Sequence, residues 1–204
     1  MYQLKSNREI DNCLLDKLAA LEEKIFGEKA VGSKIFKNIH SKRHGGLFAL
    51  VDDQNDPVGF MDAIFLSDEQ TKQYLKDHDY RKLNNTGVQK EKDNILYIFD
   101  IAVVQELRGT EAVKMLIILG ASFAQWLKGL KDEGIKFKYI FCDAVSPEGA
   151  KAAAKSMGMK PVKKTFSGLG FYYSPDNLEN YIKKNAGVIT TLKKPYYCIP
   201  IAFL

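Results

Sequence analysis

The sequence predicts a single α/β domain in which helices cover both faces of a mixed β-sheet. Three observations predict this class. Apolar strand-like runs alternate with helical segments. The nearly continuous apolar strand at 95–104 is typical of a strand at the centre of a sheet. No internal repeat, low-complexity segment or linker divides the 204 residues. We therefore expect one domain over residues 1–204.

Composition indicates a globular protein with a mild preference for anionic partners. Hydrophobic residues make up 46% of the chain, and 30 Lys and Arg against 25 Asp and Glu give a formal net charge of +5. The basic residues are spread through all segments without a long tract or interleaved aromatic residues, so they fit solvated helix faces better than a nucleic-acid surface. We expect no nucleic-acid partner.

Cysteine use and hydropathy favour the cytoplasm. Free buried thiols in a reducing compartment explain three widely separated cysteines in apolar surroundings, Cys13, Cys142 and Cys198. The N-terminus lacks an apolar signal segment, and the longest apolar run, 115–127, is too short to span a bilayer. We therefore expect no membrane partner.

The first elements are a short strand at 2–5, two helices and a hairpin. Apolar residues keep helical spacing over 10–25. A second helix is expected over 31–44, because four cations gather just before Gly45, where a helix end favours positive charge and a left-handed glycine. Strands 47–51 and 57–66 flank the turn-rich DDQNDP, which predicts a β-hairpin.

A very polar segment, residues 67–94, follows the hairpin. Ser67 and Gln70 form a capping box, so the segment should begin with a solvated helix. It is either a lid or a decoration of the domain.

The second half alternates strands with helices. In order we expect a core strand at 95–104, a long buried helix ending at Gly134, a core strand at 137–145, a helix capped by Ser146 and stopped by Gly158, strands at 160–166 and 169–173, a helix at 175–184 and a final strand at 195–204. The final strand is apolar enough to be either a core strand or the interface strand of a homodimer.

The run IAVVQELRGTEAVKML, residues 101–116, places a glycine turn between a core strand and a buried helix. Backbone N–H groups in such a turn, together with the positive end of the helix, bind anions, and Gly109 allows a close approach of the backbone. The turn therefore predicts an anion site.

This arrangement, followed by strand 137–145, a short helix and the run MGMKPVKK, resembles the GNAT superfamily of acyl-CoA-dependent N-acetyltransferases, most clearly over 97–164. The resemblance implies a three-layer fold whose fourth and fifth strands splay apart to receive the pantetheine arm. It also implies acetyl-CoA as the cofactor and a primary amine as the acceptor. The cofactor-binding residues would be Ile101, Ala102, Val103 and Val104 on the strand, and Leu107, Arg108, Gly109, Thr110 and Ala112 in the turn.

Two positions depart from the family pattern. Glu111 replaces a small residue of the turn, so its carboxylate either complements the helix dipole or repels the pyrophosphate. Ala154 stands where many relatives have the tyrosine that protonates the departing thiolate. Tyr172 is our candidate substitute, with Tyr173 and Ser156 as alternatives and strand packing as the competing role. Both departures leave open a non-catalytic module that binds acyl-CoA or a protein partner.

Asp100 is the candidate general base. A lone carboxylate in an apolar core strand is costly unless it has a function or a partner, so it either accepts the amine proton or is a hydrogen-bonded structural residue. A backbone N–H would then stabilise the oxyanion. Asp62 and Asp143 are further carboxylates near the expected cleft.

Two other chemistries find less support. Cys142 has no histidine near it in sequence, so we expect an inert buried thiol rather than a nucleophile. His40 and His44 lack a nearby carboxylate or thiolate, and we assign no metal site.

Overall fold

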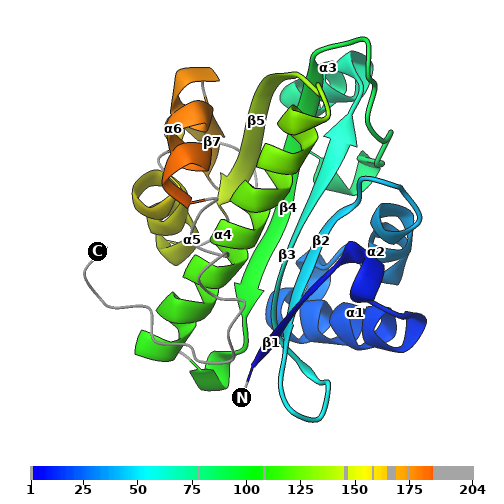
Figure 1. Cartoon of the computed structure of the whole chain (residues 1–204), viewed down its shortest axis with the longest axis vertical. Coiled ribbons are helices and arrows are strands. Elements are labelled where there is room, and N and C mark those ends of the chain that lie inside the picture. The colour runs from blue at the N-terminus through cyan, green and yellow to red at the C-terminus, as the bar shows by residue number, and fades with distance from the viewer. Residues whose placement is uncertain are drawn as a thin grey trace.

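The structure is a computed structural model that describes residues 2–77, 79–107, 109–144, 147–157, 159–164, 169–173 and 175–185. Its strands form one mixed sheet in the order β1-β2-β3-β4-β5-β7-β6 (Figure 1). Strands β4 and β5 are parallel, and every other neighbouring pair is antiparallel. The strands are β1 (Gln3–Ser6), β2 (Gly46–Val51), β3 (Pro57–Leu66), β4 (Asn94–Val103), β5 (Phe137–Ala144), β6 (Lys160–Lys164) and β7 (Leu169–Tyr173).

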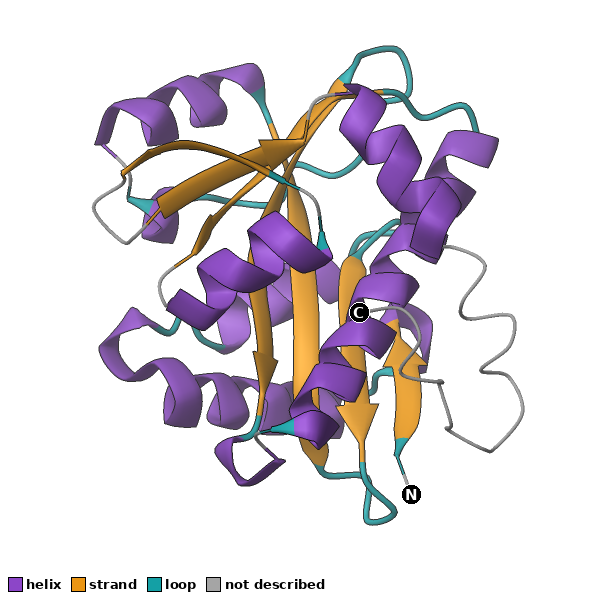
Figure 2. Ribbon diagram, turned by 90° about the vertical axis from the view of Figure 1, so that its left-hand side faces the viewer, coloured by secondary structure: helices purple, strands orange, loops and turns teal. Residues whose placement is uncertain are grey.

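Helices cover both faces of the sheet, which gives the three layers predicted (Figure 2). The helices are α1 (Asn12–Phe26), α2 (Ser33–His40), α3 (Asp68–Asp77), α4 (Thr110–Asp132), α5 (Pro147–Lys151) and α6 (Pro175–Asn185), and α5 continues into a π-helical turn, Ala152–Ser156. One core lies between the sheet and helices α1, α2 and α3, and the other between the sheet and helices α4, α5 and α6. The fold class is confirmed.

Local signals placed several elements correctly. Helix α1 begins where Asp11 Oδ1 accepts the N–H of Leu14 at 2.8 Å and ends at Gly27, whose φ is 57°. The capping box of Ser67 and Gln70 opens α3, because each side chain bonds the other residue's N–H. These bonds satisfy backbone groups that a helix end leaves unpaired.

The prediction of a helix over 31–44 is wrong at its end. Helix α2 stops at His40, and Gly45 is not left-handed. The reason is tertiary: the Asn7 side-chain amide donates to the carbonyls of His40 at 3.2 Å and Lys42 at 3.4 Å, which binds the free carbonyls at the helix end.

Helix α4 is the central helix of its core. By length and composition it is the one described helix that could cross a membrane. Leu119, Phe123 and Leu127 are nonetheless fully buried under the sheet. Burial of such side chains contributes about 1.5–3 kcal/mol each, so the apolar character of α4 is explained by packing within the domain. The predicted end at Gly134 is confirmed, with φ 82° at that residue.

Three features of the C-terminal part lie outside the described residues: the Ser146 cap, the Gly158 stop and the strand expected at 195–204. The strand pair β6–β7 and helix α6 agree with the predicted order.

Candidate functional site

The centre of the sheet splays open between its two parallel strands. Strands β4 and β5 pair from Asn94 against Phe137 to Ile98 against Cys142. Beyond Ile98, β4 runs on to Val103 with no register partner in the described part of β5. The splay predicted between these strands is therefore confirmed, and it leaves one edge of β4 open.

A β-bulge accompanies the splay. Opposite β4, Asp62 of β3 pairs with Asp100 and the next residue, Ala63, pairs with Ile98, so Phe99 is an extra residue in β4. The extra residue reverses the alternation of the strand. Asp100 consequently shares the face of Phe99, the face covered by α1 and α2.

The open edge of β4 carries the backbone groups of alternate residues. The N–H of Val104 donates to the Val58 carbonyl of the hairpin at 2.8 Å. Because antiparallel ladders bond at alternate residues, Ala102 also faces β3, while Ile101 and Val103 direct N–H and C=O toward the open edge. Of the four strand residues predicted to hold the cofactor, Ile101 and Val103 therefore present backbone groups at the open edge, whereas Ala102 and the N–H of Val104 face β3.

The glycine turn lies between the end of this strand and α4. Leu107 closes a 3₁₀ turn, and Gly109 is the N-cap of α4 with φ 97° and ψ −141°. A Cβ added to Gly109 would meet nothing within 4 Å. The N–H groups of Thr110 and Ala112 lie in the first helical turn, where a helix has no acceptors of its own. Arg108 lies outside the described residues.

Glu111 points along the helix surface. Its carboxylate accepts from Lys114 Nζ at 2.8 Å, and its side chain is 52% exposed. The ion pair places a cation beside the charge that would otherwise repel a phosphate.

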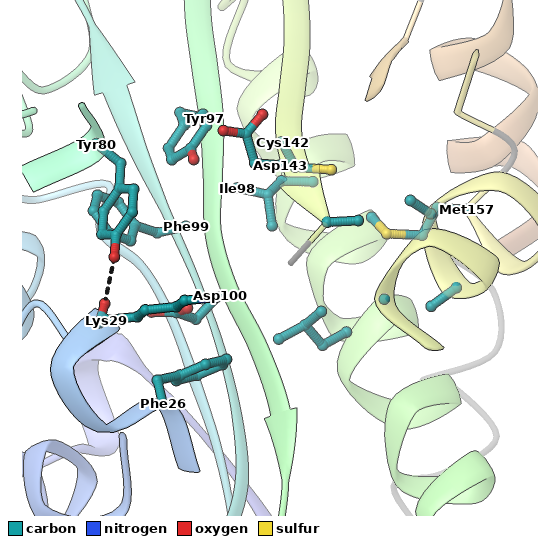
Figure 3. A pocket seen from close by; sticks show the side chains of 15 residues that line it. Phe26, Lys29, Tyr80, Tyr97, Ile98, Phe99, Asp100, Cys142, Asp143 and Met157 are labelled. Carbon is teal, nitrogen blue, oxygen red and sulfur yellow. Dashed lines mark hydrogen bonds between the residues drawn. The ribbon is translucent and has the colours of Figure 1, made fainter. Parts of the chain in front are cut away.

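A cavity of about 110 Å³ lies at the splay and is lined by residues from both sides of β4. Figure 3 shows Tyr80, Phe99 and Asp100 on one side of β4, and Cys142 and Met157 on the other. The Tyr80 hydroxyl donates to the Lys29 carbonyl at 2.8 Å, which fastens the 3₁₀ turn after α1, Gly27–Lys29, to the polar segment 67–94. That segment therefore forms part of the cavity wall.

Three carboxyl groups meet behind the cavity. The N–H of Asp100 donates to Asp62 Oδ1 at 2.8 Å. Glu22 of α1 accepts the N–H groups of Val31 at 2.7 Å and Gly32 at 2.9 Å. Asp62 is fully buried, and Glu22 is nearly so. Asp100 lines the cavity, and the bond it makes to Asp62 comes from its backbone N–H and not from its carboxylate. Its role as general base stays a prediction.

Burial governs the ionisation of these groups. Loss of water, followed by the charges of Asp100 and Glu22, holds the pKa of Asp62 well above its ordinary value. Burial and then Glu22 raise the pKa of Asp100 in the same way. Burial also raises the pKa of Glu22, and its two N–H bonds oppose that effect.

Asp143 marks the other rim of the splay. It accepts a hydrogen bond from the Tyr74 hydroxyl of α3, which also lies 3.5 Å from the hydroxyl of Tyr97. Sequence reasoning placed Asp143 near the cleft but missed Tyr74 and Glu22. Glu22 had a detectable signal, since it follows Leu18 by four residues and so falls on the buried stripe of α1.

The proton donor for a leaving thiolate is less well placed. Ala154, at the position predicted for it, is exposed, and the cavity is lined from this segment by Gly149, Ala152, Ala153 and Met157. The backbone of Tyr172 pairs with Phe141 and Lys160, while its side chain lies outside the described part of the structure.

Among the described residues, Cys142 and His44 carry no reactive arrangement. Burial raises the pKa of the Cys142 thiol to about 12, which agrees with the expected inert thiol. The expectation of a buried thiol is wrong for Cys13, which is exposed. Burial lowers the pKa of His44, which lies 3.6 Å from Glu133. In the described ranges, no three His, Cys, Asp or Glu side chains are grouped to hold a metal ion.

No protein-family model matches the chain, and no curated protein matches it in sequence. Solved structures match it in fold. The loading GNATL domain of CurA from Lyngbya majuscula gives a TM-score of 0.55 at 13% identity, over 88% of this chain and 99% of that chain. Arabidopsis thaliana NAA60 in complex with acetyl-CoA gives 0.53 at 18% identity, over 85% and 99%. Mosquito arylalkylamine N-acetyltransferase like 5b gives 0.53 at 12% identity, over 85% and 99%.

Proposed function

Because the chain has the fold of the GNAT superfamily, we propose that it transfers an acetyl group from acetyl-CoA to a primary amine. The observation that carries the proposal is the splay beyond Ile98 and Cys142, in the strand that leads into the glycine turn. A fold shared with acetyltransferases does not establish the activity, so the proposal rests on the residues of the site.

The cofactor would extend from the glycine turn into the splay. Backbone N–H groups from Gly109 to Ala112 would bind the pyrophosphate at the positive end of α4. Ile101 and Val103 would bond the pantetheine arm as though it were a strand. A drug-sized ligand needs about 300–1,000 Å³, so the cavity of about 110 Å³ has room for the reacting groups, with most of the cofactor outside it.

Asp100 would accept the proton of the amine. The nitrogen lone pair attacks the thioester carbon, the C–N bond forms, and the C–S bond breaks to release coenzyme A thiolate. The N–H of Ile101 or Val103 would meet the developing oxyanion at the open edge. The thiolate needs no dedicated acid to leave, because an ordinary thiol has a pKa of about 8.5. Tyr172 stays a prediction as its proton donor.

Binding and turnover test the proposal separately. Acetyl-CoA at a hundredfold excess over its dissociation constant should stabilise the protein by about 2.7 kcal/mol, which corresponds to roughly 5–10 °C in Tm for a chain of this length. Acetylated products from a pool of primary amines, detected by mass spectrometry, would demonstrate transfer. The absence of a thermal shift at millimolar acetyl-CoA would refute the cofactor.

Asp100→Asn should lower kcat/KM by about 10²–10⁴-fold while leaving acetyl-CoA binding intact. The matched control is Asp132→Asn, which breaks an exposed ion pair with Lys128 far along α4. Equal turnover by both variants would remove Asp100 as the base.

A second function is a non-catalytic module of the same fold that binds acyl-CoA or a protein partner. Two observations favour it: the carboxylate of Glu111 in the glycine turn, and Ala154, whose side chain cannot donate a proton, at the position where the family has its proton donor. Binding of acetyl-CoA with no acetylated product from any amine would select this alternative.

We also propose that the acetyltransferase is located in the cytoplasm and forms a homodimer.

A further inference from the structure

Asp62 and Asp100 face each other across the β3–β4 ladder. They are register partners, and the bulge at Phe99 turns Asp100 onto the face where Asp62 lies. Within the described structure, Asp62 Oδ2 and Asp100 Oδ2 are buried and lack a hydrogen-bond partner. A proton on one of these oxygens would make that oxygen a hydrogen-bond donor. Two ionised carboxylates would leave both oxygens without a hydrogen bond.

Electrostatics favour one retained proton. Two carboxylates that share a buried site cannot both ionise easily, because each charge raises the free energy of the other. Glu22 is a third carboxyl group, and it has N–H donors on both oxygens. Those bonds stabilise its charged form, so Glu22 ionises first and its charge opposes ionisation of the pair.

We propose that Asp62 and Asp100 share one proton, and that Asp62 thereby sets the pH at which Asp100 can accept the proton of the acceptor amine. Asp62 is a positioning residue, because it is fully buried and acts through Asp100. The sharing follows from the register, the burial and the unpaired oxygens of the two carboxyl groups together with their mutual repulsion, whereas its catalytic consequence rests on the proposed function. In that step the pair has already lost the shared proton to water, and the amine proton passes to the Asp100 carboxylate while the thiolate leaves; Asp100 then releases that proton to water.

The other titratable groups that line the same cavity do not offset these charges. Burial raises the pKa of Tyr80 and of Tyr97, so both hydroxyls stay neutral at neutral pH. Lys29 is exposed at the rim, where water and salt screen its charge. Asp143 is a further carboxylate, bonded by Tyr74. The pair is therefore surrounded mainly by carboxylates and neutral groups.

Carboxyl-resolved NMR of protein with carbon-13-labelled aspartate tests the sharing without any substrate. The wild type should titrate at this pair in two separated steps, the upper one well above the ordinary range for aspartate. Asp62→Asn keeps the oxygen that accepts the Asp100 N–H but removes the partner charge. It should replace the two steps with a single step that lies about one pH unit or more below the upper one. Asp132→Asn should leave both steps in place.

Stability against pH gives a second measurement on the folded wild type. Folding can raise the pKa of a carboxyl group. The stability that such a group contributes is complete below its pKa in the unfolded chain and is lost as pH rises through its pKa in the folded protein. The unfolding free energy of the wild type should therefore fall across the upper step, and that of Asp62→Asn should fall less. Ordinary one-step titration of both aspartates in the wild type would overturn the proposal, even if Asp62→Asn fails to fold.

Turnover separates this proposal from the proposed function. If acetyl transfer occurs, the acidic limb of kcat/KM should move to lower pH in Asp62→Asn by the amount that NMR measures. An unmoved limb would overturn the positioning role of Asp62. Two NMR steps in a protein with no transferase activity would support the sharing and refute the proposed function.

Discussion

Replacement of Gly109 with alanine tests the turn on which cofactor binding depends. Gly109 has φ 97° and ψ −141°, a conformation that residues with a Cβ adopt at a cost of order 1–3 kcal/mol. Since a Cβ there meets nothing within 4 Å, backbone strain is the whole cost. We expect Gly109→Ala to lower the unfolding free energy in urea by about 1–3 kcal/mol. Calorimetry should show weaker acetyl-CoA binding, because relief of the strain moves the turn.

Gly129→Ala is the matched control. Gly129 lies within the same helix, is exposed, has no left-handed φ, and would also place its Cβ in open space. Alanine is the better helix former by about 0.8–1.0 kcal/mol, so this variant should be as stable as the wild type or more stable. If Gly109→Ala behaves like Gly129→Ala, the strained turn is refuted. If stability falls and acetyl-CoA affinity does not, the turn exists but does not hold the cofactor.

Three further outcomes are expected. Glu111→Ala should bind acetyl-CoA as tightly as the wild type or more tightly in calorimetric titration, and loss of binding would make Glu111 a ligand. Iodoacetamide at pH 8 should modify exposed Cys13 long before Cys142, whose pKa is about 12, and comparable rates in peptide mass mapping would contradict the burial of Cys142. Hydrogen bonds from Gln73, from a backbone N–H and from Lys82 lower the pKa of Asp77 to about 2. The stability that these bonds contribute is therefore present above the ordinary pKa of aspartate and is lost as pH falls through the lowered pKa. Asp77→Asn should therefore lower Tm at pH 6 and converge with the wild type near pH 2, and a Tm difference that does not change with pH would count against this.

Local patterns were sufficient for most of the elements. Helix α1, the hairpin, α3 and α4 follow from apolar periodicity, capping residues and left-handed glycines, which act over a few residues of chain. The end of α2 was beyond such reasoning. It depends on Asn7, which comes from more than thirty residues upstream and binds the carbonyls at that end.

The sequence by itself determined the order of strands and helices, the glycine turn at Gly109, and the presence of a carboxylate, Asp100, in the central strand. These features are encoded locally, in periodicity and in residues that permit or forbid particular backbone angles. Only the tertiary structure decided that the β4–β5 pairing ends at Ile98 and that Asp100 shares a buried site with Asp62 and Glu22. Strand pairing, the bulge and the free energy of burying a charge depend on segments far apart in the chain, so no local pattern specifies them.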